Sequence, residues 1–152
     1  MKKRGFEIAA GWEDKNINLP VRKTAQSAGY DVECAEDVII PVFKSGMKPT
    51  LVKTGLKAYC ASDEYFMLAN RSSNPFKKGL VLANSVGIID ADYYNNPDND
   101  GHFMYAYYNF FDKDLEIKKG ETIGQVIFMK YLTIDDDNAV GDRTGGFGST
   151  TK

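Results

Sequence analysis

The hydrophobic pattern of this chain is typical of short strands separated by turns. Apolar and acidic residues alternate in Gly29-Tyr30-Asp31-Val32-Glu33-Cys34, which predicts a strand with one buried face and one accessible face that carries Asp31. Four further runs are apolar at most positions, and we expect strands covered on both sides there: Tyr65 to Ala69, Gly79 to Leu82, Phe103 to Phe111 and Ile123 to Leu132. Cover on both sides favours a sandwich, or burial against another subunit.

One segment favours a short helix. Ser73 or Asn74 can cap it, Pro75 suits the first helical position and Gly79 can end it. From Asp135 onward the apolar pattern stops and glycines accumulate. The sequence therefore predicts a single β domain over residues 1–134 and a flexible C-terminal arm over residues 135–152.

Composition narrows the class of protein. With 152 residues, 43% of them hydrophobic and 26% charged, the chain has the size and make-up of one soluble globular domain. A net charge of −2 supplies no broad basic surface, so we expect no direct nucleic-acid binding. The apolar stretch after Met1-Lys2-Lys3-Arg4 is too short for an export signal, and Cys34 and Cys60 are isolated. We expect a cytoplasmic protein with reduced cysteines and no zinc site.

Two segments combine residues that could carry chemistry. In Arg71-Ser72-Ser73-Asn74-Pro75 a guanidinium, hydroxyls and helix-start amides could cradle an anion, although a capped helix with a surface arginine explains the same residues. The segment from Asn84 to Tyr93 ends in Asp90 and Asp92, which would share a face if the chain is extended. A carboxylate beside a bound water can act as general base, and the alternative is an Asp-rich turn.

A third segment is rich in glycine, and a fourth imitates a calcium loop. Residues 141–150 could wrap phosphates and offer Phe147 as a stacking face, but they lack a P-loop ending and also fit a mobile tail. Residues 96–101 match the first half of an EF-hand loop, whose twelfth position is Tyr107 instead of glutamate. His102 is the only histidine, and we expect it on a solvent-facing strand. A Ser-His hydrolase would need it beside a Gly-x-Ser-x-Gly elbow, and the sequence has no such motif.

In order, five segments resemble the five motifs of the homotrimeric dUTPase family of bacterial or phage type, over residues 28–150. They are Ala28-Gly29-Tyr30-Asp31-Val32, then Arg71-Ser72-Ser73 with Lys78-Gly79-Leu80, then Asn84 to Tyr93, then Gly120-Glu121-Thr122-Ile123-Gly124-Gln125, and last Arg143 with 145–150. The resemblance implies an all-β subunit of distorted jelly-roll or β-clip type, either barrel or sandwich, with one short helix. It also implies a trimer whose sites take residues from three chains and are closed by the C-terminal arm.

The same resemblance implies a Mg²⁺-dependent hydrolysis of dUTP to dUMP and pyrophosphate, which limits uracil in DNA and supplies dUMP for dTMP synthesis. Asp90 would be the base that activates water for in-line attack on the α-phosphate, and Asp31 would hold Mg²⁺ through water. The residues expected to orient phosphates and water are Arg71, Ser72 and Gln125. Those expected to contact the nucleoside or the phosphates are Ser73, Asn84, Gly87, Ile89, Tyr93, Arg143, Phe147, Gly148, Ser149 and Thr150.

Within this set, the hairpin from Asn84 would read uracil, Tyr93 would exclude a ribose 2′-hydroxyl and Phe147 would stack on the base. Arg143 stands one residue closer to Phe147 than the family spacing, and the segment after Tyr93 is longer than usual. Residues 94–101 could bind a protein regulator, so a regulatory binding module is one alternative. A dCTP deaminase, which uses a glutamate near the base, is another.

Overall fold

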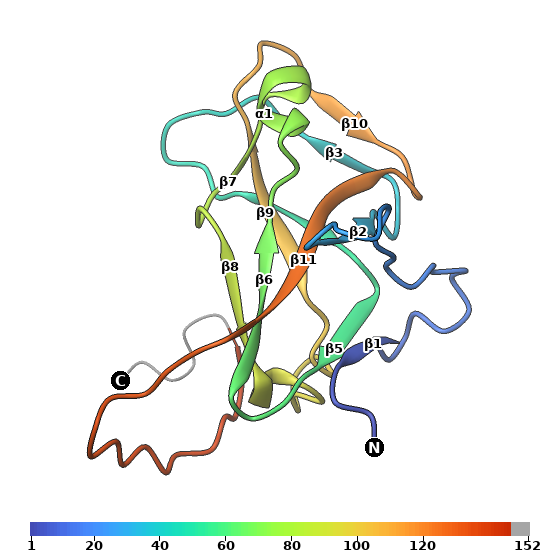
Figure 1. Ribbon diagram of the computed structural model, residues 1–152. Helices are drawn as coiled ribbons and strands as arrows, with labels where there is room; N and C mark the ends of the chain where they lie inside the picture. The colour runs from blue at the N-terminus through green and yellow to red at the C-terminus, as the bar shows by residue number, and fades with distance from the viewer. Residues whose placement is uncertain (147–152) are drawn as a thin grey trace.

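The computed structural model describes residues 1–146, and β-strands make up most of its regular structure (Figure 1). The strands are β1 (Gly5–Ile8), β2 (Tyr30–Glu33), β3 (Val38–Ile40), β4 (Thr50–Lys53), β5 (Leu56–Tyr59), β6 (Glu64–Ala69), β7 (Leu80–Leu82), β8 (Gly87–Asp90), β9 (Met104–Asn109), β10 (Leu115–Ile117) and β11 (Thr122–Lys130). One helix, α1 (Ser73–Lys78), and one 3₁₀ turn, η1 (Ala91–Tyr93), complete the elements of residues 1–146.

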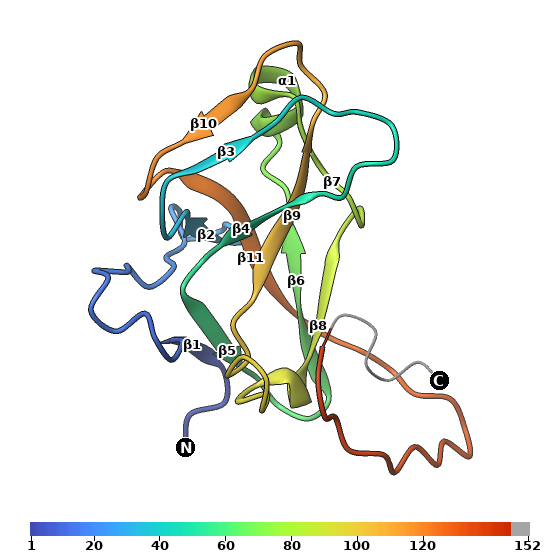
Figure 2. The ribbon, with the colours of Figure 1, turned by 180° about the vertical axis from the view of Figure 1, so that it is seen from behind.

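The strands form four antiparallel sheets. The largest has the order β2-β11-β6-β8, a second has the order β4-β9-β7, and the pairs β1-β5 and β10-β3 flank them (Figures 1 and 2). Within residues 1–146 no sheet closes on itself, so the subunit is a sandwich and not a closed barrel. The mainly β architecture with one short helix agrees with the prediction from the sequence.

The core lies between the two larger sheets. Phe66, Leu68 and Val126 of the four-stranded sheet pack in one hydrophobic cluster with Tyr105 and Tyr107 of β9. The hydroxyls of both tyrosines donate across the core, to the Gln125 carbonyl at 2.6 Å and to the Ile123 carbonyl at 2.5 Å. These hydrogen bonds satisfy the polar ends of two buried rings and hold β11 at a fixed position.

The opposite face of the four-stranded sheet is only partly covered. Burial alternates strictly along β6, with Glu64, Phe66 and Leu68 buried and Tyr65, Met67 and Ala69 half-buried. Val32 of β2 is fully buried and Asp31 is half-buried, as the alternating pattern predicted. The apolar runs predict strands that are covered on both faces. Within this chain, the second face of β6 is only partly covered.

Helix α1 corrects one detail of the sequence prediction. Its N-cap is Ser72, without a side-chain cap hydrogen bond, so neither Ser73 nor Asn74 caps it and Pro75 is not its first residue. The reason is that the Asn74 side chain points inward and donates to Asn70 Oδ1 at 2.8 Å and to the Ile123 carbonyl at 3.0 Å. Gly79 ends the helix in the left-handed conformation, with φ of 65°, as predicted.

Candidate active site

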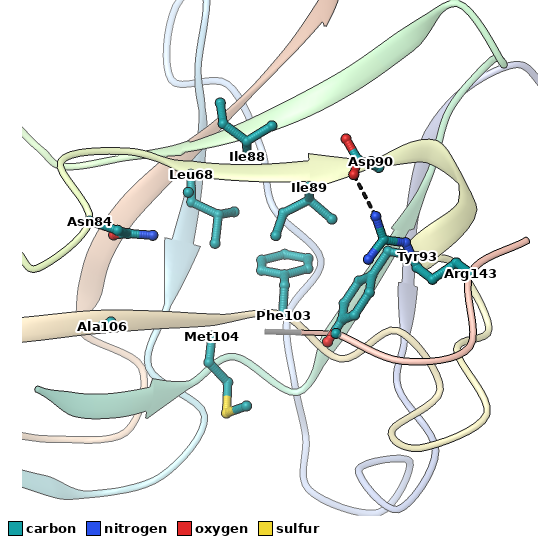
Figure 3. A pocket seen from close by; sticks show the side chains of 12 residues that line it. Leu68, Asn84, Ile88, Ile89, Asp90, Tyr93, Phe103, Met104, Ala106 and Arg143 are labelled. Atoms are coloured by element: carbon teal, nitrogen blue, oxygen red, sulfur yellow. Dashed lines mark hydrogen bonds and ion pairs between the residues drawn. The ribbon is translucent and has the colours of Figure 1, made fainter. Parts of the chain in front are cut away.

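A cavity of about 340 Å³ lies beside β8, between this strand and β9 (Figure 3). Six residues singled out in the sequence line it together: Asn84, Gly87, Ile89, Asp90, Tyr93 and Arg143. Leu68, Ile88, Phe103, Met104, Ala106 and Gly146 complete the lining. Asn84 lies at one end, and Asp90, Tyr93 and Arg143 lie at the other (Figure 3). The cavity is therefore elongated, with an amide at one end and charged groups at the opposite end.

Strand β8 sets the shape of this cavity. A Cβ at Gly87 would lie 2.9 Å from the Leu68 Cβ, so glycine permits β8 to approach β6 closely. Further along, Ile89 points toward Phe103, whereas Ile88 points to the other side of the strand (Figure 3). The strand ends at Asp90, and the 3₁₀ turn η1 then directs Tyr93 back into the cavity wall. The chain is not extended through Asp92, which lies in η1, so the condition under which Asp90 and Asp92 would share a strand face is not met.

Arg143 joins the C-terminal segment to the acidic end of the cavity. Its Nη2 lies 2.5 Å from Asp90 Oδ2 and its Nε lies 2.7 Å from Asp92 Oδ1. The hydrogen bond with Asp92 raises the pKa of the guanidinium above its usual value. Both carboxylates stay more than half exposed while the arginine side chain is only 15% exposed. Arg143 therefore engages one oxygen of Asp90, and the rest of that carboxylate stays open to solvent.

A second cluster of predicted residues gathers around Gln125. This residue pairs with Asp31 of β2 on one side and with Ala69 of β6 on the other. Its Nε2 donates to the Asn70 carbonyl at 3.1 Å, and a Cβ at Gly29 would lie 2.0 Å from its Oε1. Glycine at position 29 thus leaves space for this amide, which explains the glycine of the first motif.

Arg71 and Ser72 lie between β6 and α1, Ser73 is the first residue of α1, and all three are next to this second cluster. Asn70 organises the turn, because its Oδ1 accepts from the Arg71 amide at 2.9 Å and its Nδ2 donates to the Leu80 carbonyl at 2.9 Å. The sequence did not single out Asn70. An asparagine after an apolar run looks like an ordinary turn residue until its partners on other strands are known.

The two clusters are far apart in one chain. Asp90 is opposite Tyr65 in the β6-β8 register, and Gln125 is opposite Ala69 in the β6-β11 register. Four residues of β-strand correspond to about 13 Å. Among residues 1–146, none of Asp31, Arg71, Ser72, Ser73 and Gln125 lines the cavity that contains Asp90.

Asp31 fits a magnesium site in which the protein and the substrate phosphates each supply ligands. Its side chain enters no hydrogen bond or ion pair with residues 1–146, and no group of three His, Cys, Asp or Glu side chains gathers there in that range. Mg²⁺ retains several waters and is usually held by one or two carboxylates together with substrate phosphates. A single half-buried carboxylate with open acceptor oxygens meets that requirement.

His102 differs from its prediction. It is buried, at 8% exposure, outside any strand, and its Nε2 accepts from the Gly55 amide at 2.9 Å. Burial, helped by the nearby Lys53 charge, lowers the pKa of His102 to about 4. The solvent-facing position expected from the sequence is therefore wrong, because the imidazole serves as a buried hydrogen-bond acceptor.

Other expectations concern the termini and the class of protein. Phe147, Gly148, Ser149 and Thr150 lie outside the described residues. Cys34 and Cys60 are free thiols. No helix formed by residues 1–146 has the length and apolar content that a membrane crossing needs.

Comparison with known proteins agrees with the geometry. The model of the dUTPase family matches residues 15–151. The deoxyuridine 5′-triphosphate nucleotidohydrolase of Lactococcus lactis is 51% identical, with 99% of each chain covered. The crystal structure of the dUTPase from Streptococcus mutans has a TM-score of 0.79 and 47% identity, and covers 86% of this chain and 98% of that one.

A more distant structure, a variant dUTPase from Staphylococcus aureus phage phi11, details the coordination of a structural Mg(II) ion. It has a TM-score of 0.71 at 16% identity, with 91% of this chain and 97% of that chain covered, so the likeness concerns the fold alone. The family model and the Lactococcus relative span nearly all of the chain, including residues 28–150, which contain the five motifs. The chain belongs to the dUTPase family.

Proposed function

We propose that the chain hydrolyses dUTP to dUMP and pyrophosphate, and that the cavity beside β8 holds the nucleoside and the α-phosphate. The observation that carries the proposal is the joint lining of one cavity by Asn84, Tyr93 and Asp90, within a chain 51% identical to a dUTP nucleotidohydrolase. Release of pyrophosphate from dUTP by the purified protein tests it. Release of ammonia from dCTP would support the deaminase alternative instead.

In this mechanism Asp90 takes a proton from the attacking water. A carboxylate at the end of a cavity, more than half exposed, can hold a water by one oxygen while the other stays engaged. General-base help of this kind contributes about 10²–10⁴-fold to a rate. The water then attacks the α-phosphorus in line with the leaving pyrophosphate.

The opposite end of the cavity would select the base. Backbone groups and the side chain of the Asn84 hairpin can pair with the Watson–Crick edge of uracil, and a cytosine would present the wrong donor. Buried polar groups left unpaired by a wrong base make such recognition much more selective than shape alone. Gly87 and Ile89 would form the floor under the nucleoside, since both lie between Asn84 and Asp90.

Arg143 would change partners when substrate binds. Arg143 pairs with Asp90 and Asp92, and a bound triphosphate would offer the same guanidinium a more highly charged bidentate partner. Its departure would release the Asp90 oxygen that it holds, while the other oxygen of that carboxylate keeps the water. The arm over residues 135–152 would then close with Phe147 on uracil and Gly148, Ser149 and Thr150 on the phosphates, which expels water from the site.

The second cluster would position the triphosphate. Arg71 with Ser72 and Ser73 supplies donors for phosphate oxygens, and Gln125 would orient the attacking water. Asp31 would hold Mg²⁺ through a coordinated water. When bound, the ion offsets the negative charge that develops on the phosphate oxygens.

We also propose that the active unit is a homotrimer. Gln125 and Asp90 must reach the same water, yet in one chain they are separated by about 13 Å along β6. A second copy that brings its own Gln125 to this Asp90 removes the conflict. The half-buried face of the largest sheet, which carries Met67, Ile88 (54% exposed) and Met129 (39% exposed), is an apolar surface suited to that contact.

Sedimentation tests the assembly. We expect three chains for the native protein, and Ile88→Glu should give monomers that stay folded but lose most of the dUTP hydrolysis. Ile39→Glu changes a similarly exposed isoleucine on β3, in another sheet, and should leave both properties unchanged. A fully active monomer would contradict the shared site.

Two remaining proposals concern context. Both cysteines are free thiols, and the substrate belongs to the intracellular nucleotide pool, which supports a cytoplasmic location. A protein regulator at residues 94–101 remains a prediction from the sequence.

A further inference from the structure

The segment 94–101 folds back on the cavity wall. Asp100 accepts from the Ala10 amide at 2.8 Å and pairs with Lys57 at 2.9 Å, and Lys57 also donates to Asn95 Oδ1 at 2.7 Å. A Cβ at Gly101 would lie 2.7 Å from the Tyr93 carbonyl oxygen, and its φ of +83° also favours glycine. These contacts tie the segment to two neighbouring parts of the chain and press its end against Tyr93.

Asn99 is the residue of this segment that reaches Tyr93. Its Nδ2 donates to the Tyr93 hydroxyl at 2.6 Å, and the hydroxyl in turn donates to the His102 carbonyl at 3.1 Å. The amide orientation is fixed, because Asn99 Oδ1 accepts from the Gly101 backbone N–H at 3.1 Å, which can only donate. The tyrosine hydroxyl is thus held by one donor and one acceptor, in a residue only 6% exposed.

We propose that Asn99 is a positioning residue that sets the sugar specificity of the site by locking Tyr93. This inference rests on the proposed function, in which the Tyr93 ring lies against the deoxyribose. The ring stands at the Asp90 end of the cavity (Figure 3), so the sugar between base and α-phosphate passes beside it. A ribose 2′-hydroxyl brought there would meet a ring that cannot withdraw and a tyrosine hydroxyl whose partners are already in place.

The hydrogen bond from Asn99 to Tyr93 explains how a chain with a long 94–101 segment keeps a site that is selective for the sugar. A 2′-hydroxyl buried without a hydrogen-bond partner weakens the binding of a ribonucleotide. This penalty persists only if the Tyr93 ring does not move. Loss of the Asn99 donor leaves Tyr93 with a single hydrogen bond. The ring could then shift, and its hydroxyl could pair with the 2′-hydroxyl of UTP.

The substitution Asn99→Ser removes the contact with Tyr93 and preserves the hydrogen bond of the local turn. A serine hydroxyl can still accept from the amide two residues later, as Asn99 Oδ1 does from Gly101, but it is too short to reach Tyr93. We expect the ratio of kcat/KM for dUTP over UTP to fall about tenfold, as for the loss of one hydrogen bond. Asp98→Ala removes an exposed side chain of the same segment and should leave the ratio unchanged.

A double-mutant cycle with Tyr93→Phe tests whether Asn99 acts through the Tyr93 hydroxyl. The phenylalanine lacks the hydroxyl, so Asn99→Ser should change the dUTP/UTP ratio no further in that background. An unchanged ratio in the wild-type background, or an equal fall in both backgrounds, would overturn the inference. Equilibrium binding of dUMP and UMP gives a readout that does not need turnover.

The binding measurement also separates this inference from the proposed function. A chain that prefers dUMP over UMP, loses the preference with Asn99→Ser, and yet leaves dUTP intact would contradict the hydrolase and uphold the role of Asn99. A chain that hydrolyses dUTP, with a dUMP preference unchanged by Asn99→Ser, would uphold the hydrolase and overturn the role of Asn99. A chain that binds neither nucleotide would overturn both.

Discussion

The buried imidazole of His102 makes the free energy of unfolding depend on pH. Protonation of Nε2 would set two donors, the imidazolium N–H and the Gly55 N–H, against each other at a 2.9 Å contact. Burial lowers the pKa of His102 from 6.5 to about 4 in the folded chain. The unfolded chain therefore binds more protons between these values, so the stabilisation is fully present above pH 6.5 and is lost as the pH falls toward 4.

The linkage relation gives the size of the effect. For pKa values of 6.5 unfolded and about 4 folded, the free energy of unfolding should drop by about 2 kcal/mol between pH 7 and pH 5. In a domain of this size that corresponds to a fall in Tm of about 4–8 °C. The pKa of Glu64 is lowered from 4.5 by the Arg4 hydrogen bond, so its contribution is lost only at more acidic pH.

Urea denaturation at a fixed protein concentration, at half-unit steps from pH 7 to pH 5, measures this drop. His102→Gln supplies an acceptor that does not titrate, and since His102 is the only histidine the variant should have a nearly flat profile. A native protein whose stability is constant over the window would refute the reasoning. An equal slope in the variant would assign the effect to other groups.

Four further predictions concern the site and the sheet that supports it. Asp90→Asn should lower kcat for dUTP by about 10²–10⁴-fold with little change in nucleotide binding, measured by pyrophosphate release and dUMP titration, and a near-native rate would exclude Asp90 as the base. Asp31→Asn should raise the Mg²⁺ concentration needed for half-maximal rate without lowering Tm; an unchanged metal dependence would contradict the assignment. Truncation after Val140 should cut activity and leave the sedimentation of the assembly unchanged, whereas native kinetics would remove the arm from the mechanism. Gly124→Ala would place a Cβ 2.4 Å from the Tyr105 ring and should cost about 1–3 kcal/mol in urea denaturation, against no measurable cost for Gly141→Ala, where no atom lies within 4 Å.

Local pattern was enough to locate most of the strands that build the site. Alternation around Asp31 and the apolar runs that became β6, β7, β9 and β11 follow from side chains that must face a core, which is a local requirement. The order of the five motifs then placed Asn84, Asp90 and Tyr93 in one site, and the cavity brings them together.

What the sequence could not predict depends on contacts between distant segments. Asn74 looks like a helix cap, but its side chain lies inward, where it donates to the Ile123 carbonyl on β11. His102 looks like a surface residue of a polar stretch until the Gly55 amide, from a turn far away in the sequence, is placed against it. Asn99 has no pattern of its own, and its contact with Tyr93 exists only because the intervening loop turns back.

The proposed hydrolysis depends most directly on a water activated by Asp90 in a cavity that accepts deoxyuridine. The decisive measurement is pyrophosphate release with Mg²⁺ across dUTP, UTP, dTTP and dCTP under identical conditions. We expect rapid release from dUTP and far slower release from the other three. A protein that leaves dUTP intact, or cleaves all four nucleotides at similar rates, would contradict the central claim.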